Sequence, residues 1–325
     1  MNPFGRVLCA ILLATLTVTV QAQTRWDLPA AYPTSNFHTQ NLVQFATEVE
    51  RASGGKLKIT VHANASLFKA PEIKRAVQGG QAQAGEILLS NFANEWPIFG
   101  VDALPFLAES YEASMRLYQA QRPALKQRLA KQGMLLLYAV PWPPQAVVAK
   151  RPITAAADLK GVKWRAYNPA TSRMAELLGA QPVTVQAAEL AQAMATGVVE
   201  AYMSSAATSY EARTYEHIKY YIDVQAWLPK NAVLANQAAF EALAPTVQAA
   251  LLKAAAAAET RGWELSRLKN TEYQQLLKDN GMTILPAPAR LKQDLQRIGT
   301  VMLNEWLQQA GAEGRALIDA YRKPT

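Results

Sequence analysis

Short strands and amphipathic helices alternate along the first 90 residues. Leu57, Ile59 and Val61 alternate with polar residues, as in a half-buried strand. The apolar residues before and after this run recur at intervals of three and four, as on one face of a helix. The predicted elements are strands at 25–31, 57–61 and 84–90, with helices around 42–49 and 71–77. This βαβαβ order predicts an α/β domain with a largely parallel sheet.

A proline-rich segment divides the pattern after the apolar strand predicted at 134–140. Residues 141–145 read Pro-Trp-Pro-Pro-Gln, and each proline fixes its own φ and restrains the preceding residue. We place a crossover to a second domain at this rigid segment and a return crossover at 227–230. Helices are predicted at 110–118 and 125–131 before the first crossover. Between the crossovers, strands are predicted at 162–166, 182–185, 198–203 and 218–224, with helices at 172–178, 187–196 and 210–215.

A long helix is predicted over 245–279, which is rich in alanine and has no internal proline beyond its first residue. At 1.5 Å per residue it would span roughly 50 Å. Since a helix of that length seldom serves one small domain, we expect it to bridge both. The predicted division is domain I at 23–142 plus 231–268, and domain II at 143–230 plus 269–325.

The N-terminus has the pattern of a secretory signal peptide. Arg6 precedes an apolar run over 7–20 that is too short to span a membrane, and Val-Gln-Ala at 20–22 is a small-x-small cleavage site. Cleavage after Ala22 removes Cys9, the only cysteine. The sequence therefore predicts a periplasmic protein without disulfides or thiolate sites.

Charge and motifs argue against nucleic-acid binding and catalysis. The net charge of +8 at pH 7 is spread along the chain, with no basic block or nucleic-acid motif. His38, His62 and His217 have neither metal-ligand spacing nor an evident acidic partner, and no nucleophile elbow or phosphate-binding loop is present. We predict no enzyme activity, no cofactor and no metal.

Arg165 is the first candidate binding residue. A glycine turn at Gly161 releases a short strand, on which Trp164 and Arg165 face opposite sides. Arg165 would lie near the carboxyl end of this strand, where open α/β sheets present ligand-binding groups. Its guanidinium suits a carboxylate because its planar fork donates two charge-assisted hydrogen bonds. A surface arginine or an internal ion pair would explain this stretch equally simply.

Other candidates lie at predicted strand ends. Glu86 is flanked by apolar residues on a strand, so it needs a partner, which is either a ligand or a structural cation. Aromatic residues also gather at strand ends and crossovers, where a cleft would lie, although core packing explains any one of them. These aromatic residues are Trp142, Trp164, Tyr167, Tyr202 and Trp227.

Several segments in chain order resemble motifs of one family. The chain resembles the DctP-type periplasmic solute-binding subunits of tripartite ATP-independent (TRAP) transporters over nearly its whole mature length. Asp-Leu-Lys-Gly-Val-Lys-Trp-Arg at 158–165 is similar to that family's D-L-K-G-L-K-I-R, and Leu-Gly-Ala-Gln-Pro-Val at 178–183 to its L-G-A-x-P-V. Further matches are Gly-Gly-Lys-Leu-Lys-Ile at 54–59, Asp-Ala-Leu-Pro-Phe-Leu at 102–107 and the run 189–200.

The resemblance implies a two-domain periplasmic binding protein fold with an interdomain cleft. It implies that Arg165 binds the carboxylate of a small organic acid, that closure of the domains captures it, and that a TRAP permease receives it. Ser204 stands where many members have asparagine, and Trp142 and Gln145 lie where many have a second arginine. These departures favour a monocarboxylate, aromatic and keto acids included, over a dicarboxylate or sialic acid. The predicted ligand-binding residues are Arg165, Trp142, Gln145, Tyr202, Ser204, Ser205, Glu86, Asn36 and Trp227.

Three other functions remain open at this stage. A binding protein of the ABC type or of a sensor would share the fold. A secreted enzyme acting on organic acids would need an acid–base pair or a nucleophile that the sequence does not display. A structural export protein would bind no ligand. We expect the protein to be a monomer.

Overall fold

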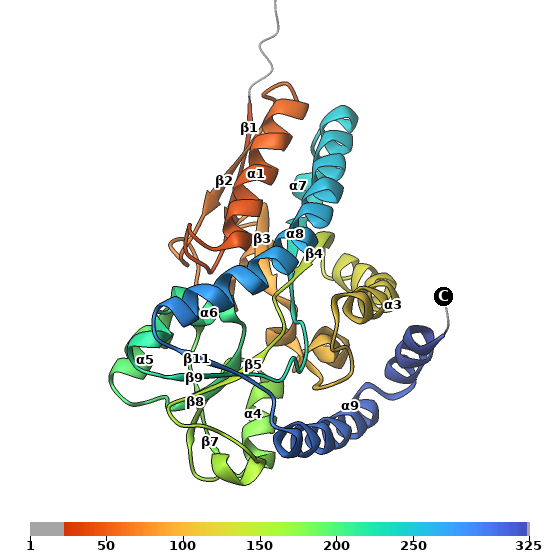
Figure 1. The fold of residues 1–325 in the computed structure, drawn as a ribbon. Coiled ribbons are helices and arrows are strands. Elements are labelled where there is room, and N and C mark those ends of the chain that lie inside the picture. Colours follow the sequence, from red (N-terminus) through yellow and green to blue (C-terminus); the bar gives the residue numbers. More distant parts are fainter. Residues whose placement is uncertain (1–22, 324–325) are drawn as a thin grey trace, which may run out of the picture.

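The structure is a computed structural model that describes residues 23–323 (Figure 1). The predicted signal peptide at 1–22 lies outside the described residues. The strands are β1 (Thr24–Pro29), β2 (Leu57–His62), β3 (Ala84–Leu88), β4 (Met134–Pro141), β5 (Ala146–Ala149), β6 (Lys163–Ala166), β7 (Gln181–Thr184), β8 (Ala201–Ser204), β9 (Tyr220–Asp223), β10 (Lys230–Asn236) and β11 (Thr283–Pro286). The α-helices are α1 (Phe37–Ala52), α2 (Ala70–Gln78), α3 (Tyr111–Ala130), α4 (Pro169–Leu177), α5 (Leu190–Ala195), α6 (Ala206–Glu211), α7 (Gln237–Glu241), α8 (Pro245–Asp279) and α9 (Ala289–Arg322). The 3₁₀ helices include η1 (Leu89–Phe92) and η2 (Pro97–Ala103).

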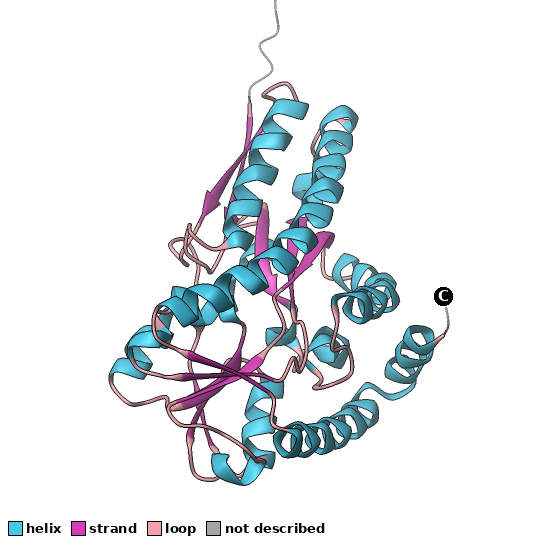
Figure 2. Cartoon of the chain, in the orientation of Figure 1, coloured by secondary structure: helices cyan, strands magenta, loops and turns pink. Residues whose placement is uncertain are grey.

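The strands form three sheets in two lobes, with helices packed around them (Figures 1 and 2). Lobe 1 is the part built on the pair β1–β2 and the sheet β3–β10–β4, and lobe 2 is the part built on the six-stranded sheet β11–β9–β5–β8–β6–β7. Because β10 returns from lobe 2, it runs antiparallel to both β3 and β4. The largely parallel sheet predicted for the first domain is therefore wrong for these strands, although β1 and β2 are parallel.

The two crossovers between the lobes lie side by side and are hydrogen-bonded to each other. The Trp142 N–H donates to the Pro229 carbonyl (2.7 Å), and the Gln145 N–H donates to the Trp227 carbonyl (2.9 Å). The Ala226 N–H donates back to the Gln145 carbonyl (3.0 Å). Both predicted crossovers are thus part of one two-stranded connection, whose backbone polar groups are paired although it is buried.

The predicted long helix is observed over its full length as α8. It packs on α1 and β4 in lobe 1 and on α6 and β11 in lobe 2, so it bridges the lobes. Gly262 permits this close approach, because a Cβ there would lie 2.3 Å from Val140 Cγ2. The domain limits predicted from the sequence stay a prediction.

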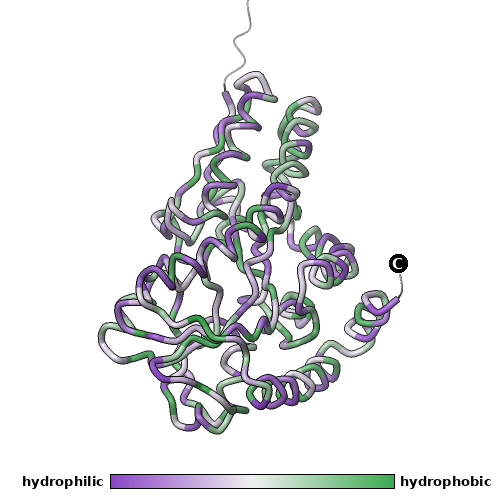
Figure 3. The backbone as a smooth tube through the Cα atoms, in the orientation of Figure 1, coloured by the Kyte–Doolittle hydropathy of each residue, from purple (hydrophilic) through white to green (hydrophobic). Residues whose placement is uncertain are grey.

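The C-terminal helix α9 is a second bridge between the lobes. It packs on α3 and η2 in lobe 1 and on α4 in lobe 2 (Figure 1). Hydrophobic and hydrophilic residues alternate along it (Figure 3), and the buried residues, such as Leu295, Met302 and Trp306, recur at helical spacing. Gly311 has a non-helical backbone with a φ of 59°, and the helix kinks there.

Two helices predicted on either side of residue 123 form one continuous helix, α3, which has Pro123 inside it. A proline removes one backbone hydrogen bond and costs about 3 kcal/mol in a helix interior. Buried residues on both sides of it, such as Leu117, Leu125 and Leu129, hold the helix against lobe 1. Tertiary packing therefore outweighs the helix-breaking effect of Pro123.

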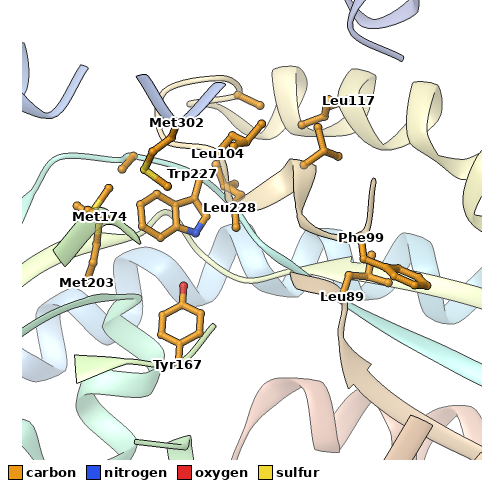
Figure 4. Packing of buried hydrophobic residues seen from close by; sticks show 14 of the residues in the cluster. Leu89, Phe99, Leu104, Leu117, Tyr167, Met174, Met203, Trp227, Leu228 and Met302 are labelled. Carbon is orange, nitrogen blue, oxygen red and sulfur yellow. The ribbon is translucent and has the colours of Figure 1, made fainter. Parts of the chain in front are cut away.

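A hydrophobic cluster runs from lobe 1 into lobe 2 around the return crossover (Figure 4). Trp227, only 1% exposed, has Met174 and Met203 of lobe 2 and Met302 of α9 around its indole. Leu104 of lobe 1 belongs to the same cluster. The crossover is therefore anchored in a core that both lobes share.

Candidate functional site

A cavity of about 330 Å³ lies between the lobes. Its volume is at the lower end of the range for small-molecule sites. Lobe 1 and lobe 2 both contribute wall residues, and most of the wall is apolar or aromatic. The wall includes Ala31, Tyr32, Ala65, Lys69, Ala70, Pro71, Glu86, Ile87, Leu88, Asn91, Trp142, Gln145, Arg165, Tyr167, Gln186, Ala187, Ala188, Glu189, Ser204, Thr208 and Pro229.

Strand pairing brings the polar residues of lobe 2 to one edge of its sheet. β6 and β8 are parallel, with Arg165 opposite Tyr202, so both strands end at the same edge. β5 is antiparallel to β8, and its first residue, Ala146, is opposite Ser204. Gln145, just before β5, therefore lies beside Ser204 and near the end of β6. This edge is the side on which open sheets bind ligands.

Arg165 is 2% exposed and has no ion-pair partner among residues 23–323. Its Nε–H donates to the Val185 carbonyl (2.9 Å), and its guanidinium lies over the Tyr167 ring, 5.1 Å from the ring centre. Burial lowers the pKa of Arg165, while the nearby tyrosines oppose this shift. A guanidinium nevertheless stays protonated in proteins. The site therefore holds a buried positive charge that lacks a counter-ion, with its orientation fixed.

Gln145 and Tyr167 form the rigid base around this arginine. The Gln145 Nε2–H donates to the Pro143 carbonyl (2.9 Å), and the Tyr167 hydroxyl donates to Gln145 Oε1 (3.2 Å). These bonds fix the Tyr167 ring beneath the guanidinium, so that little side-chain ordering is left for ligand binding.

Glu86 is on the wall that lobe 1 contributes, at 3% exposure on β3. Its Oε1 lies 3.6 Å from His38 Nδ1, and its Oε2 makes no hydrogen bond within 23–323. Burial raises the pKa of Glu86 to about 7, which the neighbouring Asn231 amide opposes. Burial also lowers the pKa of His38 well below its usual value, so that His38 is neutral at pH 7.

Aromatic packing fixes the surroundings of Glu86. The Trp142 indole lies 4.4 Å from the His38 ring and 4.8 Å from the Tyr32 ring, between ring centres. Its N–H donates to Asn231 Oδ1 (2.9 Å), which leaves the Asn231 Nδ2–H groups for other partners. Trp142 therefore lines the cavity and also orients a polar neighbour of Glu86.

Two polar contacts outside the cavity wall join the lobes. The Asn168 Nδ2–H of lobe 2 donates to Ser90 Oγ of lobe 1 (2.8 Å). Asn36, at the start of α1, donates to both oxygens of Glu211 on α6 (3.0 and 2.8 Å), and the Tyr273 hydroxyl of α8 donates to the same carboxyl (3.1 Å).

Five predicted ligand-binding residues, Arg165, Trp142, Gln145, Ser204 and Glu86, line this one cavity. Their binding role stays a prediction. The other four are placed elsewhere.

Each of these four has a structural task. The Tyr202 hydroxyl lies 3.1 Å from Ser209 Oγ and 2.7 Å from Thr214 Oγ1. Ser205 caps the N-terminus of α6, and Asn36 caps that of α1. Trp227 is in the shared core. None of the four is among the cavity wall residues, so their positions do not support contact with a ligand.

Sequence reasoning missed several wall residues, Tyr32 and Asn91 among them. Tyr32 follows the first strand, as Tyr167 follows β6, so a strand-end rule applied to both lobes would have found it. Asn91 belongs to η1, a 3₁₀ turn without a sequence signal. No cluster of three or more His, Cys, Asp or Glu suited to a metal occurs within 23–323. No helix in that range is both long and apolar enough for a membrane span.

The buried carboxyl groups predict how stability depends on pH. Burial raises the pKa of Glu86 and of Glu211 to about 7 and that of Asp102 to about 6. Between the ordinary pKa and the raised one, the folded state binds more protons than the unfolded state, so the free energy of unfolding falls as pH rises. The lowered pKa of His38 acts in the opposite direction below its ordinary value, but the three carboxyl groups outnumber it. We therefore expect the Tm of the ligand-free protein to fall between about pH 5 and pH 8, measured by differential scanning calorimetry.

The control for this prediction is Glu86→Gln, which removes one of the titrating groups. Its Tm should fall less steeply over the same range. A Tm that rises steadily to pH 8 in the unmutated protein would contradict the prediction.

A family model and several known proteins match most of this chain. A model of "Bacterial extracellular solute-binding protein, family 7" (DctP) matches residues 30–309. The C4-dicarboxylate-binding periplasmic protein DctP of Rhodobacter capsulatus is 25% identical over 285 residues, which are 85% of this chain and 84% of that protein.

Two solved structures are more similar in sequence. DctP6 of Bordetella pertussis, an extracytoplasmic solute receptor binding pyroglutamic acid, is 61% identical with a TM-score of 0.92, covering 93% of this chain and 100% of that one. A TRAP solute-binding protein specific for pyroglutamate, from an unidentified microbe in a marine metagenome, was solved with co-purified pyroglutamate. It is 44% identical with a TM-score of 0.91, covering 93% of this chain and 100% of that one. The predicted two-domain fold is confirmed.

Proposed function

Because this chain belongs to bacterial extracellular solute-binding protein family 7, we propose that it is a TRAP-type extracytoplasmic receptor whose solute is pyroglutamate. Pyroglutamate is a five-membered lactam with a single carboxylate. The likeness to two receptors that bind this acid supports the choice, since each is covered over its whole length. Pyroglutamate is a monocarboxylate, which is the class of solute that the sequence favours.

The observation that carries the proposal is Arg165. A buried guanidinium without a counter-ion is costly to keep, and an arriving carboxylate would supply one. Since Nε already donates to Val185, the Nη groups are left for a forked pair with the two carboxylate oxygens. A monocarboxylate such as pyroglutamate needs no second cation in the cavity, whereas a dicarboxylate would favour one.

The walls suit a compact ring. Trp142, Tyr167, Ile87, Leu88 and Pro229 offer apolar and aromatic surface on several sides. A micromolar Kd needs about −8 kcal/mol, and a hydrogen bond to a charged group contributes about 1.5–3 kcal/mol. Burial of the ring and further polar contacts must therefore supply much of the affinity.

Capture by closure of the lobes would deliver this burial. The paired crossovers at 141–145 and 226–230 provide a hinge, while Asn168–Ser90 and Asn36–Glu211 provide contacts that opening would break. A ligand that touches both lobes favours the closed state by its differential affinity for that state.

The setting follows from the family and from the predicted signal peptide. We propose that the receptor works in the periplasm, passes its solute to TRAP permease subunits, and acts as a monomer. Family members are receptors, and we propose that this chain likewise leaves its ligand chemically unchanged. The alternative, a secreted enzyme, would convert pyroglutamate to glutamate or another product on long incubation.

We expect pyroglutamate to be found in the protein purified from cells, by native mass spectrometry and analysis of the ligand released on denaturation. Isothermal titration of the stripped protein should give one site with a Kd of about 1 µM or below. Succinate and acetate serve as controls for a dicarboxylate and a bare monocarboxylate. Binding of succinate but not pyroglutamate would overturn the proposed solute and leave the receptor assignment intact.

A further inference from the structure

Glu86 is a buried wall residue whose chemistry the carboxylate anchor does not explain. Arg165 accounts for a ligand anion, yet the opposite lobe places a second carboxyl group in the same cavity. A carboxylate of the protein would repel an anionic ligand unless it meets a hydrogen-bond donor. We therefore expect the ligand to have a hydrogen-bond donor where it faces Glu86.

We infer that Glu86 accepts the ring N–H of the ligand and thereby selects lactam acids over ring acids that lack this hydrogen. The inference rests on the proposed function, since it concerns how the same cavity recognises pyroglutamate. It assigns selectivity to lobe 1 and anchoring to lobe 2.

The candidate acceptor is the Glu86 carboxyl group, which is on the cavity wall at 3% exposure. Its Oε2 is fully buried beside the Asn231 amide and has no hydrogen-bond partner within residues 23–323. The other oxygen, Oε1, faces His38 Nδ1 at 3.6 Å, longer than a hydrogen bond. No lysine or arginine of the described chain forms an ion pair with Glu86. A buried acceptor of this kind is seldom left unsatisfied in a native protein.

The side chain is also held in place. β3 pairs with β10, which puts Glu86 opposite Val233 and sets Asn231 two residues along, opposite Leu88. Trp142 fixes the Asn231 amide through its oxygen (2.9 Å), and the Asn231 amide lies beside the Glu86 carboxyl. The acceptor is thus preorganised, which a selective contact requires.

Glu86 and Arg165 line the same cavity from opposite lobes. They are too far apart to form an ion pair, yet the Tyr32 hydroxyl is close enough to both to be influenced by each charge. In pyroglutamate, the nitrogen and the carboxylate are attached to the same ring carbon. A ligand whose carboxylate is held by Arg165 would therefore present its N–H within a few ångströms of that anchor, and in the pose we infer this N–H is turned toward Glu86.

The charge state agrees with an acceptor role. Burial raises the pKa of Glu86 to about 7, so the empty site has the carboxylate and the acid in comparable amounts at neutral pH. A donated N–H favours the carboxylate form. The neutral His38 and the Asn231 amide face it from α1 and β10, and neither supplies a positive charge.

The test compares pyroglutamate with 5-oxotetrahydrofuran-2-carboxylate, in which a ring oxygen replaces the N–H and every other group is kept. Isothermal titration at pH 8 should show the lactone binding the unmutated protein roughly 100-fold or more weakly, since a site built around a donor rejects an analogue that lacks it. In Glu86→Gln the amide can turn its NH₂ toward the ring oxygen, so the preference should shrink to about tenfold or less. Glu112→Gln, at an exposed ion pair with Arg267, is the matched control and should keep the full preference.

The outcomes separate this inference from the proposed function. Equal affinity for lactam and lactone in the unmutated protein would overturn the role of Glu86 and leave the receptor for pyroglutamate standing. An unchanged preference in a folded Glu86→Gln, verified by its Tm, would do the same. Failure of pyroglutamate itself to bind the unmutated protein would instead remove the proposed function.

Discussion

Replacing Arg165 with alanine is expected to weaken pyroglutamate binding by about 2–5 kcal/mol, or roughly 30- to 5000-fold in Kd. The change deletes the buried positive charge to which the ligand carboxylate would be paired, and it leaves that carboxylate desolvated without a partner. No lysine or arginine elsewhere on the wall is comparably buried, because Lys69 is exposed. Isothermal titration against pyroglutamate measures the loss.

Two further variants show whether binding depends on the planar pair of guanidinium donors of Arg165 or on its positive charge alone. Arg165→Lys keeps the charge but loses the planar pair of donors and the bond from Nε to Val185, so an intermediate loss is expected. Lys163→Ala removes an exposed cation from the same strand and should leave Kd unchanged. An Arg165→Ala protein that folds and binds with unaltered Kd would remove Arg165 from the site.

Asp102→Ala is expected to destabilise the protein by about 3–5 kcal/mol, the cost of leaving a buried charge without its partner. Lys230 is fully buried at the start of β10, with Nζ 3.7 Å from Asp102 Oδ2, and the same oxygen accepts its backbone N–H (2.8 Å). Burial lowers the pKa of Lys230 while Asp102 opposes this shift, so losing Asp102 would leave the ammonium with the burial penalty alone. Urea denaturation monitored by tryptophan fluorescence measures the loss.

The double variant Asp102→Asn with Lys230→Met separates charge from hydrogen bonding. It removes both charges yet keeps an acceptor for the backbone N–H of residue 230, so most of the stability should return. Glu112→Ala breaks an exposed ion pair with Arg267 and should cost less than about 1 kcal/mol. A single Asp102→Ala variant no less stable than Glu112→Ala would show that the buried pair contributes little.

Local sequence signals predict those elements whose own residues mark where they begin and end. The sequence predicts the helix over 245–279 at both ends because its alanine-rich run starts at Pro245, has no later proline and contains one glycine, Gly262, before Gly281. Pro123 misled the prediction of α3, since the packing that retains it comes from residues distant in sequence. The direction of β10 could not be read from its own residues, because it depends on the crossover that returns the chain to lobe 1.

The candidate site likewise has some residues that a local sequence pattern reveals and others that only the fold reveals. Arg165 could be found because a turn glycine, a short strand and a basic residue at its end lie within six positions of one another, and a family motif covers the same stretch. Tyr202 has the same strand-end signal, yet its hydroxyl turns to Ser209 and Thr214. The neighbours of Glu86 come from α1, β10 and the crossover, so only the fold reveals that one of its oxygens is left free.

The placement of β10 between β3 and β4 also decides the order in which this molecule can be made. During synthesis β3 and β4 emerge long before residues 230–236, and the strand that must pair with both is then absent. Until it arrives, each presents unpaired backbone groups of the kind that recruit other chains. A product truncated before Lys230 would therefore be an aggregation hazard, and lobe 1 cannot be produced as one contiguous fragment. Completion of the lobe 1 sheet therefore waits until residues 230–236 have been made.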